Sequence, residues 1–363
     1  MQVAQQQNGE TASAEMLVNL DEPILVTGAS GFIGSKVVEN LLRRGFTDLR
    51  CFVRPSSNTE KLEALIRPFR QGARVKVVEG NLLSRQDCLA ATRDAMLVYH
   101  LAAGTGIDSF PDAFMNSAVT TRNLLEATLE WKCLKRFISV SSFTVYTNCN
   151  KPRRVLDEAC PIEARPELRG DAYCYAKVKQ DELLTEYGKK FGIPYVILRP
   201  GVVYGPGKKG ITGRVGLGTF GIFLHLGGSN QVPLTYVDNC ADAIVLAGLK
   251  KGVDGETFNV VDDNLPSSRQ LLRLYKRNVK SFRSIYLPHL ASYLFFYAWE
   301  KYSKWSGGQL PPVFNRRVWH AYWKGSHYTN EKLKRLLGWS QLIPTSEGLR
   351  SYLESCQRAE SHA

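Results

Sequence analysis

Residues 23–42 read "PILVTGASGFIGSKVVENLL", and this stretch decides the fold that we expect for the chain. A short apolar run leads directly into Gly28, Gly31 and Gly34, and a helical pattern follows them. Glycines at this spacing permit a tight turn, a close approach of the backbone to a pyrophosphate, and close packing of the helix on the strand. The start of the helix adds free N–H groups and the positive end of its dipole. A glycine triplet alone would also fit a plain turn, but the strand–turn–helix context predicts dinucleotide binding.

The pattern around this stretch alternates between β-rich runs and helical segments from Pro23 to Val145. The runs "LRCFVR", "RVKVVEGN", "MLVYHLAA" and "CLKRFISVSS" are separated by helical patterns, and "YVILRPG" adds a later strand. Such alternation predicts a parallel sheet covered on both faces. We therefore expect an α/β fold, a Rossmann-type doubly wound parallel sheet with a smaller C-terminal α/β substrate lobe. The expected divisions are a disordered leader over 1–20, a dinucleotide-binding domain over 21–205 that includes the catalytic residues, and a mainly substrate-binding lobe over 206–355 from which some segments return to the first domain.

Composition and cysteine usage exclude several classes of protein. The 363 residues are 44% hydrophobic and 22% charged, which is typical of a globular protein. No apolar run reaches the roughly 18 residues that a membrane span needs, and the N-terminus has no secretory pattern. The eight cysteines are scattered, without a C-x-x-C pair or a His/Cys cluster. We expect free buried thiols, no metal site and a cytoplasmic location.

Positive charge gathers in one segment. The net charge is +13, and residues 273–324 contain ten Lys or Arg but a single acid, Glu300. This segment includes the apolar stretch "IYLPHLASYLFFYAWEKYSKW" and four of the six tryptophans. Two interpretations stay open: peripheral contact of residues 285–324 with an anionic membrane or the mouth of an apolar pocket, and a buried helix pair that closes the lobe. No nucleic-acid recognition module is visible, so nucleic acid is not expected as a partner. A homodimer is left open.

The end of the second strand bears on the choice of cofactor. A site for NAD commonly has Asp or Glu there, which binds the ribose 2′-hydroxyl. This chain has Arg54 instead, with Lys61 seven residues further on. Cations suit a 2′-phosphate, so the sequence predicts NADP(H) rather than NAD(H). The alternative is that Arg54 is a solvated surface residue.

Several motifs in order resemble the extended short-chain dehydrogenase/reductase family, also called the NAD-dependent epimerase/dehydratase family. They include "TGASGFIG", "GNLLS", "HLAA", "SVSSFTVY", "YCYAK", "ILRPGVVYGPG" and "TYVDNCADAIVLA". The resemblance implies a Rossmann sheet, a C-terminal substrate lobe and a catalytic Ser/Thr–Tyr–Lys set, which falls on Ser142, Tyr173 and Lys177. Asn81 stands where the family usually has Asp, and Ser117 stands where an Asn is usual, which puts a proton relay through that position in doubt.

The glycine turn and the resemblance together give the expected cofactor contacts. Asn81 would contact the adenine, and Lys177 would bind the ribose hydroxyls. The segment that begins at Arg199 would lie beside the nicotinamide. The predicted contacts are Gly28, Ser30, Gly31, Phe32, Ile33, Gly34, Arg54, Lys61, Asn81, Leu82, Leu101, Ala102, Ala103, Tyr173, Lys177, Pro200 and Val203.

The stretch "YCYAKVK" holds two overlapping Tyr-x-x-x-Lys pairs. At 100° per residue, Tyr173 and Lys177 share a stripe with apolar residues, whereas Tyr175 and Lys179 share one with carboxylates. We therefore expect the first pair to face the cofactor and the second to be solvated. The Lys177 ammonium and an oxidised nicotinamide would favour the phenolate, and so we expect a lowered pKa for Tyr173.

The substrate is the least determined feature. The segment "NQVPLTYVDN" lacks the Arg-Asp pair of many nucleotide-sugar enzymes, and the tail resembles the 3β-hydroxysteroid dehydrogenase branch. The first hypothesis is therefore an NAD(P)-dependent oxidoreductase that acts on a secondary alcohol or ketone of a steroid-like or lipidic small molecule. The alternative is a nucleotide-sugar epimerase or dehydratase, in which Lys208, Lys209 and Arg214 would meet the diphosphate. A third hypothesis is a module that binds the dinucleotide without turnover, but the intact catalytic set argues against it.

Overall fold

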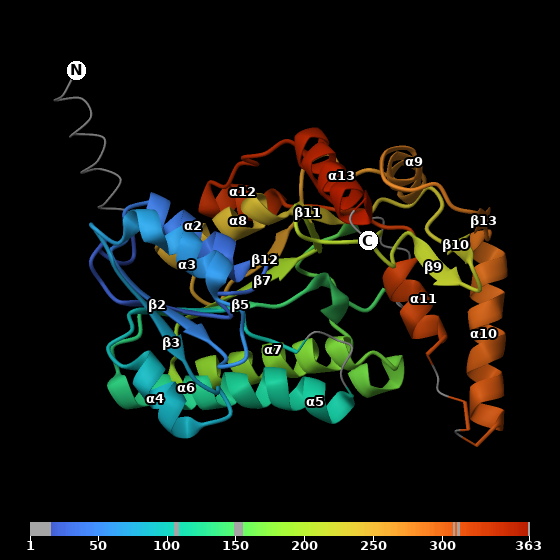
Figure 1. The fold of residues 1–363 in the computed structure, drawn as a ribbon. Helices are drawn as coiled ribbons and strands as arrows, with labels where there is room; N and C mark the ends of the chain where they lie inside the picture. The colour runs from blue at the N-terminus through green and yellow to red at the C-terminus, as the bar shows by residue number, and fades with distance from the viewer. Residues whose placement is uncertain (1–15, 105–108, 149–154, 308, 311–312, 362–363) are drawn as a thin grey trace.

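The computed structural model describes residues 16–104, 109–148, 155–307, 309–310 and 313–361 (Figure 1). A seven-stranded parallel sheet forms the centre, with the strand order β12-β7-β5-β4-β1-β2-β3. Its chain order reverses between β1 and β4, as in a doubly wound fold, so the predicted Rossmann architecture is confirmed. The strands of this sheet are β1 (Ile24–Thr27), β2 (Asp48–Val53), β3 (Arg74–Glu79), β4 (Leu97–His100), β5 (Arg136–Val140), β7 (Tyr195–Pro200) and β12 (Thr257–Val260).

Helices cover both faces of the sheet. Figure 1 shows α2, α3, α8 and α12 over one face and α4, α5, α6 and α7 over the other. Strands β1, β4 and β5 are buried along their whole lengths, whereas β3, at the edge of the sheet, has only half-buried and exposed residues. The helices are α2 (Gly34–Arg43), α3 (Glu60–Ile66), α4 (Arg85–Thr92), α5 (Phe110–Phe114), α6 (Thr120–Trp131), α7 (Ala172–Phe191), α8 (Val237–Leu249), α9 (Ser268–Asn278), α10 (His289–Trp305), α11 (Arg316–Tyr322), α12 (Glu331–Leu337) and α13 (Thr345–Ser361).

The C-terminal half contributes to two regions. Strand β12 joins the edge of the central sheet beside β7, and α8 packs against α2. A separate three-stranded sheet, in the order β13-β10-β9, supports α10 at the far end of the molecule (Figure 1). The remaining strands are β6 (Val155–Leu156), β8 (Val202–Tyr204), β9 (Gly216–Thr219), β10 (Ile222–His225), β11 (Leu234–Tyr236), β13 (Ser284–Tyr286) and β14 (His327–Tyr328).

The predicted disordered leader, residues 1–20, includes residues that are folded in the structure. Residues 1–15 lie outside the described residues, but residues 16–20 are packed on the sheet domain. The Leu17 amide donates to the Leu249 carbonyl at 2.8 Å, and Val18 is buried in the main apolar cluster. Two apolar residues in succession supply the hydrophobic contact that a solvated leader would lack. Residues 16–20 therefore belong to the folded part.

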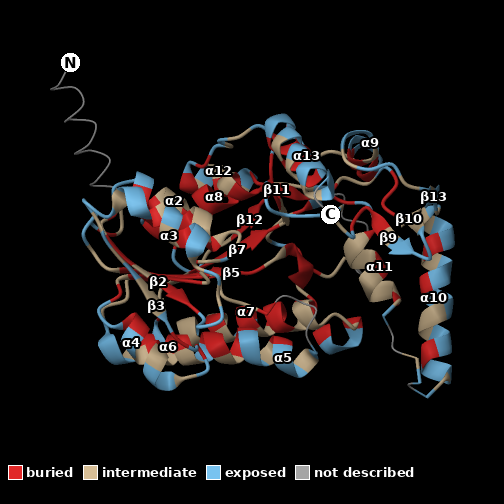
Figure 2. Ribbon diagram, viewed as in Figure 1, coloured by how far each residue is buried: buried red, intermediate tan, exposed pale blue. Residues whose placement is uncertain are grey.

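The tryptophans of the basic segment do not form one surface. Trp319 and Trp323 are buried with Phe296 and Leu226, in a cluster between α10 and α11. Trp305, at the end of α10, is 79% exposed. The helix-pair interpretation therefore holds for the inner side of α10, while its outer side faces solvent (Figure 2).

Two further expectations concern cysteines and membrane spans. All seven cysteines in the described segments are free thiols, and six of them are buried, which agrees with the expectation; Cys149 lies outside these segments. Among the helices of the described residues, none combines the length and apolar character required to span a bilayer.

Candidate functional site

The predicted site residues meet at the carboxyl edge of the central sheet. In a parallel sheet, the segments that follow neighbouring strands lie along the same edge, and ligands bind where the strand order reverses. Gly28 follows β1, Ala102 follows β4 and Ser142 follows β5. A Cβ atom added to Gly28 would lie 3.0 Å from the Ala102 nitrogen, so the β1 and β4 segments are in direct contact. The topology thus brings the glycine turn and Ser142, the predicted catalytic serine, to one edge.

The glycine turn has the shape of a phosphate cradle. Gly28 has φ +67°, and the Gly31 amide donates to its carbonyl at 2.9 Å. A Cβ atom on Gly34 would come within 2.1 Å of the Gly28 oxygen, so only glycine allows α2 to start so close to the strand. No side chain caps the N-terminus of α2, which leaves its positive end to an anion. The described residues therefore fit the pyrophosphate of a dinucleotide.

The expected contacts with the adenosine half lie at the ends of β2 and β3. Arg54 directly follows β2 and Lys61 lies in the first turn of α3; both are exposed, and neither forms an ion pair within the described part of the chain. Asn81 follows β3, and its side-chain oxygen accepts from the Leu83 amide at 2.9 Å. The Asn81 side-chain oxygen thereby stabilises the turn after β3, and the side-chain nitrogen Nδ2 remains as a donor for an adenine.

Tyr173 and Ser142 form the proposed catalytic pair. Tyr173 lies in the first turn of α7, whose N-cap residue Asp171 accepts from the Cys174 amide at 3.0 Å. The Ser142 hydroxyl lies close enough to the Tyr173 phenol to act on its pKa as a hydrogen-bond partner, which favours the phenolate. Burial raises the pKa of Tyr173 to about 12, although the Ser142 hydroxyl opposes this. The expected lowering of this pKa is therefore wrong for the protein alone, because burial outweighs the favourable contact.

Lys177 is held beside the phenol by two acceptors. Its Nζ donates to the Val140 carbonyl at 2.6 Å and to Gln180 Oε1 at 2.9 Å, and it lies 5.9 Å from the centre of the Tyr173 ring. Burial lowers the pKa of Lys177 to about 8, while Asp181 acts in the opposite direction. An ammonium has three donors, so the third N–H remains for a ribose hydroxyl.

A buried chain of hydrogen bonds connects Lys177 to the glycine turn. Gln180 Nε2 donates to Thr121 Oγ1 at 2.9 Å, and Thr121 Oγ1 donates to the Ser117 carbonyl at 2.6 Å. Because the single Thr121 proton is thus used, His100 Nε2 must carry the hydrogen that it shares with Thr121 at 2.9 Å.

The other end of this chain reaches β1. His100 Nδ1 then accepts from Thr27 Oγ1 at 2.8 Å, and Thr27 lies next to Gly28. Burial lowers the pKa of His100 to about 3, with a further contribution from Lys177, which agrees with a neutral ring that carries one N–H. Sequence reasoning missed Gln180, whose only signal is that it lies one helical turn after Lys177.

Ser117 joins the hydrogen-bond chain to Lys177 only through its backbone carbonyl, not through its side chain. Its hydroxyl accepts from the Gly104 amide at 3.1 Å, within the π-helical turn Met115–Val119 that joins α5 and α6. The doubt raised by the missing Asn is thus answered by a different arrangement, in which Gln180 contacts the lysine directly.

Tyr322 of α11 is a second residue that the sequence did not reveal. Its hydroxyl donates to Asp171 Oδ2 at 3.1 Å, and its ring lies between two guanidinium groups, 5.5 Å from Arg169 and 5.1 Å from Arg214. Negative charge on Tyr322 would raise the pKa of Tyr173, so the two phenols are near each other. The C-terminal lobe therefore reaches the catalytic helix through α11.

The second Tyr-x-x-x-Lys pair is only partly solvated. Lys179 forms the expected ion pair with Glu182 at 2.8 Å. Tyr175, however, packs against Phe110 and Phe114 of α5, with ring centres 5.5 and 6.1 Å apart. The helical pattern could not show this, because α5 covers that side of α7 only in the tertiary structure.

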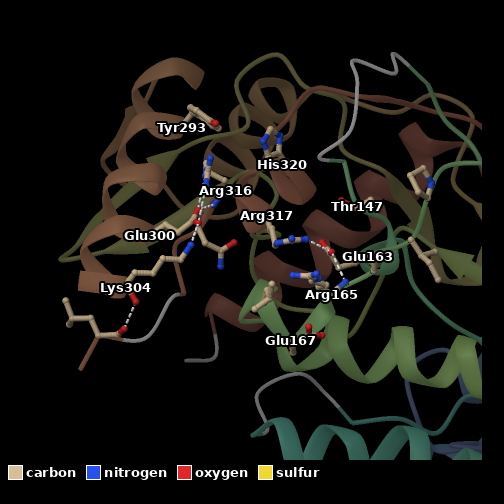
Figure 3. Close-up of a pocket in the computed structure, with 17 residues that line it drawn as sticks. Thr147, Glu163, Arg165, Glu167, Tyr293, Glu300, Lys304, Arg316, Arg317 and His320 are labelled. Carbon is tan, nitrogen blue, oxygen red and sulfur yellow. Dashed lines mark hydrogen bonds and ion pairs between the residues drawn. The ribbon is translucent and has the colours of Figure 1, made fainter. Parts of the chain in front are cut away.

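Two cavities lie near these residues. One of about 440 Å³ borders Asp171 and Ala172, the residues just before Tyr173, and its other walls are mostly apolar, including Phe314 and Trp323. Another of about 890 Å³ lies between α10, α11 and residues 161–168 (Figure 3). None of the predicted catalytic or cofactor residues lines either cavity, but Asp171 and Ala172 at the wall of the smaller one directly precede Tyr173, so the smaller cavity is the better candidate for the substrate.

Three ion pairs line part of the larger cavity. Figure 3 shows Arg316 and Lys304 directed at Glu300, and Arg317 directed at Glu163. The hydrogen bond from Arg316 lowers the pKa of Glu300 to about 2, so this carboxylate stays ionised. These pairs hold α10 and α11 against the loop that precedes the catalytic helix.

Known proteins resemble this chain in both sequence and structure. The chain is 31% identical over 252 residues to a trifunctional UDP-glucose 4,6-dehydratase/UDP-4-keto-6-deoxy-D-glucose 3,5-epimerase/UDP-4-keto-L-rhamnose-reductase of Arabidopsis thaliana, covering 65% of this chain and 36% of that protein. The chain thus spans about a third of the length of the first curated relatives it matches. It is 24% identical to the 3beta-hydroxysteroid-dehydrogenase/decarboxylase isoform 1 of Arabidopsis thaliana over 91% of this chain and 79% of that one.

The structural comparison supports the fold. The UDP-glucuronic acid 4-epimerase of Bacillus cereus, in complex with UDP-glucuronic acid and NAD, superposes with a TM-score of 0.68 at 23% identity, over 93% of this chain and 99% of that chain. The sequence model of the NAD dependent epimerase/dehydratase family matches residues 24–260, which include the glycine turn, Ser142, Tyr173 and Lys177. The chain belongs to the NAD dependent epimerase/dehydratase family.

Proposed function

We propose that the protein is an NAD(P)-dependent enzyme that interconverts a secondary alcohol and a ketone, with Ser142, Tyr173 and Lys177 as its catalytic residues. The observation that carries this proposal is the position of the Lys177 ammonium, fixed on the Val140 carbonyl and 5.9 Å from the centre of the Tyr173 ring, with the Ser142 hydroxyl near the same phenol. A bound nicotinamide would supply or accept the hydride. The chain supplies the groups that bind and protonate the substrate oxygen.

Each residue has a distinct part in the proton transfer. Ser142 donates a hydrogen bond to the substrate oxygen and holds it near Tyr173. The Tyr173 phenol gives its proton to that oxygen during reduction and takes it back during oxidation. The raised pKa of Tyr173 favours the protonated form, so the phenol is ready as an acid. The Lys177 ammonium stabilises the phenolate that forms after the proton has left.

We propose a nucleotide sugar as the substrate. The support comes from relatives at about 30% identity, which include the trifunctional dehydratase/epimerase/reductase and a Bacillus subtilis protein named as an uncharacterized UDP-glucose epimerase. They favour the alternative in the sequence analysis over the steroid-like substrate that was placed first. Two cations lie where a diphosphate could meet them: Lys208 Nζ is 5.1 Å from the Phe32 ring at the glycine turn, and Arg214 lies against Tyr322.

A lipidic or steroid-like substrate is the second candidate, and one specific observation favours it. The 440 Å³ cavity before Tyr173 is lined mostly by apolar side chains, among them Phe110, Leu217, Phe314 and Trp323. Apolar walls suit a hydrocarbon skeleton better than a sugar diphosphate. The 3beta-hydroxysteroid-dehydrogenase/decarboxylase match also extends through the residues that form these walls, since it covers 91% of the chain.

One pair of assays distinguishes the two candidates. The purified enzyme would be incubated with UDP-glucose or UDP-glucuronic acid, and the products separated while the cofactor absorbance is followed. Conversion of the sugar without net change of cofactor supports the nucleotide-sugar proposal. Steady consumption of reduced cofactor with a 3-ketosteroid, and none with any nucleotide sugar, would replace it with the second candidate.

The choice between NAD and NADP belongs to the same proposal. The family description names NAD, and the Bacillus cereus neighbour was solved with NAD. The preference for NADP(H) rests only on Arg54 and Lys61, which are exposed at the end of β2 and in α3. A homodimer and a cytoplasmic location stay predictions from the sequence.

A further inference from the structure

Helix α10 stands at the edge of the C-terminal lobe and exposes an apolar side (Figures 1 and 2). Its inner side carries Ser292, Phe296 and Ser303, which are buried toward α11. The opposite side is unusual for a surface helix, since those normally place polar residues toward water. Within the described residues, nothing covers this side.

The exposed side is continuous along the helix. At 100° per residue, Leu290, Leu294, Tyr297, Lys301 and Trp305 fall within about 80° of one another. Leu290 is 71% exposed, Leu294 53% and Trp305 79%. Contiguous apolar patches of this kind mark interaction surfaces rather than ordinary solvent-facing surface.

Two more exposed apolar side chains lie in β13, just before the helix in the chain. Ile285 and Tyr286, in the strand that precedes α10, are 54% and 44% exposed. The Tyr302 ring stacks on Trp305 at the far end, with the ring centres 5.7 Å apart. Aromatic rings and lysines at the ends of an apolar stripe are the composition of helices that lie at a membrane–water interface.

The charges around this patch indicate the kind of partner that it would bind. Glu300 is the single acid between residues 273 and 324, and its carboxylate is already taken up by Arg316 and Lys304, each at 2.9 Å. The exposed side of α10 therefore presents cations without free acids. In a two-fold dimer through this side, two identical basic surfaces would face each other, and neither would offer a free acid from residues 273–324 to Lys301. An anionic surface with an apolar interior satisfies both the charge and the apolar side chains.

We propose that the outward side of α10, together with Ile285 and Tyr286, docks on an anionic phospholipid bilayer, with the helix lying in the plane of the interface. The proposed membrane contact is smaller than the one expected from the sequence over residues 285–324. It leaves out Trp319 and Trp323, because both are buried in the lobe. The inner side of α10 touches the candidate substrate cavity, since the Phe296 ring lies 5.2 Å from that of Phe314. The docked helix would place this cavity next to the membrane. The proposal does not depend on which substrate the enzyme uses.

The test is co-sedimentation of the full chain with vesicles of phosphatidylcholine alone and of phosphatidylcholine with phosphatidylserine. We expect binding to the anionic vesicles that weakens as salt is raised. Lys301→Glu should weaken this binding by about fivefold or more, since each basic residue near the surface contributes about that factor. Leu294→Ser combined with Trp305→Ser should weaken it by about tenfold or more, through the loss of apolar burial.

The matched control is Phe191→Ser combined with Leu342→Ser. Both residues are about half exposed, like Leu294, but they lie at the end of α7 and after α12. This variant should bind the vesicles as the wild type does. Circular dichroism of every variant would show that the fold is retained.

Three results would overturn the proposal. The first is equal binding to neutral and anionic vesicles, or no binding to either. The second is an equal loss in the control variant. The third is a concentration-dependent dimer in gel filtration that Leu294→Ser with Trp305→Ser dissociates, which would make a second copy of the chain the occupant.

Discussion

Replacement of Gln180 by Met tests whether the buried hydrogen-bond chain positions Lys177 for catalysis. Met has nearly the same length and fills the same space, but it offers no amide oxygen to the Lys177 ammonium, which now lies 2.9 Å from Gln180 Oε1. It also offers no N–H to Thr121, at present 2.9 Å away. Gln180 is not expected to touch the substrate, so its effect must pass through Lys177.

The size of the effect follows from the charge on the partner. A hydrogen bond to a charged group contributes about 1.5–3 kcal/mol, and one pKa unit corresponds to about 1.4 kcal/mol. Loss of the Gln180 acceptor should therefore lower the pKa of Lys177 by roughly 1–2 units from its value of about 8. For a shift of one unit, the protonated fraction at pH 7.5 would fall from about three quarters to about a quarter.

The assay is the pH dependence of kcat/KM. Activity requires the ammonium, so it falls as the pH rises through the pKa of Lys177, and Gln180→Met should move this alkaline limb toward lower pH by about one unit. The control is Thr185→Ala, which removes a hydrogen bond of 2.8 Å to the Asp181 carbonyl on the same helix without touching Lys177. An unmoved limb in Gln180→Met, or an equal shift in Thr185→Ala, would refute the positioning role.

Four more outcomes follow from the structure. Tyr173→Phe should abolish turnover while leaving dinucleotide affinity within about twofold, and Tyr175→Phe should retain most activity; a larger loss in the second variant would reverse the choice of pair. Arg54→Asp should shift the preference toward NAD in a comparison of kcat/KM for the two cofactors, and an unchanged ratio would remove Arg54 from the site. Arg214→Met should raise KM for a nucleotide sugar by about tenfold without an equal loss for a neutral ketone, and equal losses would mean a structural role. Burial raises the pKa of Asp262 to about 6, whereas its pKa in the unfolded chain is about 4. The protonated side chain therefore stabilises the fold below pH 4, and this stabilisation is lost as the pH rises through 6. Asp262→Asn should remove this decrease of the unfolding free energy with pH, as measured by urea unfolding, and an unchanged pH dependence would contradict the reasoning.

The sheet domain could be predicted because its signals are local. The β1 run and the glycine spacing fix a strand, a turn and a helix within twenty residues, and the contact of Gly34 with the Gly28 oxygen explains why no other residue fits there. The pairing of Tyr173 with Lys177 rests on one helical turn, which the spacing also shows.

The remaining features depend on contacts between distant segments. Gln180 belongs to the site because it bonds Thr121, which in turn bonds His100, and both lie far from Gln180 in the sequence. Tyr322 lies 149 positions after Tyr173 in the sequence. The raised pKa of Tyr173 reflects burial, which spacing on one helix does not report. Tyr175 was wrongly expected to be solvated for the same reason, since α5 covers it.

The most direct measurement is the binding of NAD and NADP, in both oxidation states, to the purified wild-type chain by titration calorimetry. The close approach of α2 to β1 at Gly28 and Gly34 leaves the uncapped start of the helix open to a diphosphate. We expect saturable binding of at least one of these pyridine dinucleotides. A folded protein that binds none of them would contradict the assignment of Ser142, Tyr173 and Lys177 as a hydride-transfer site.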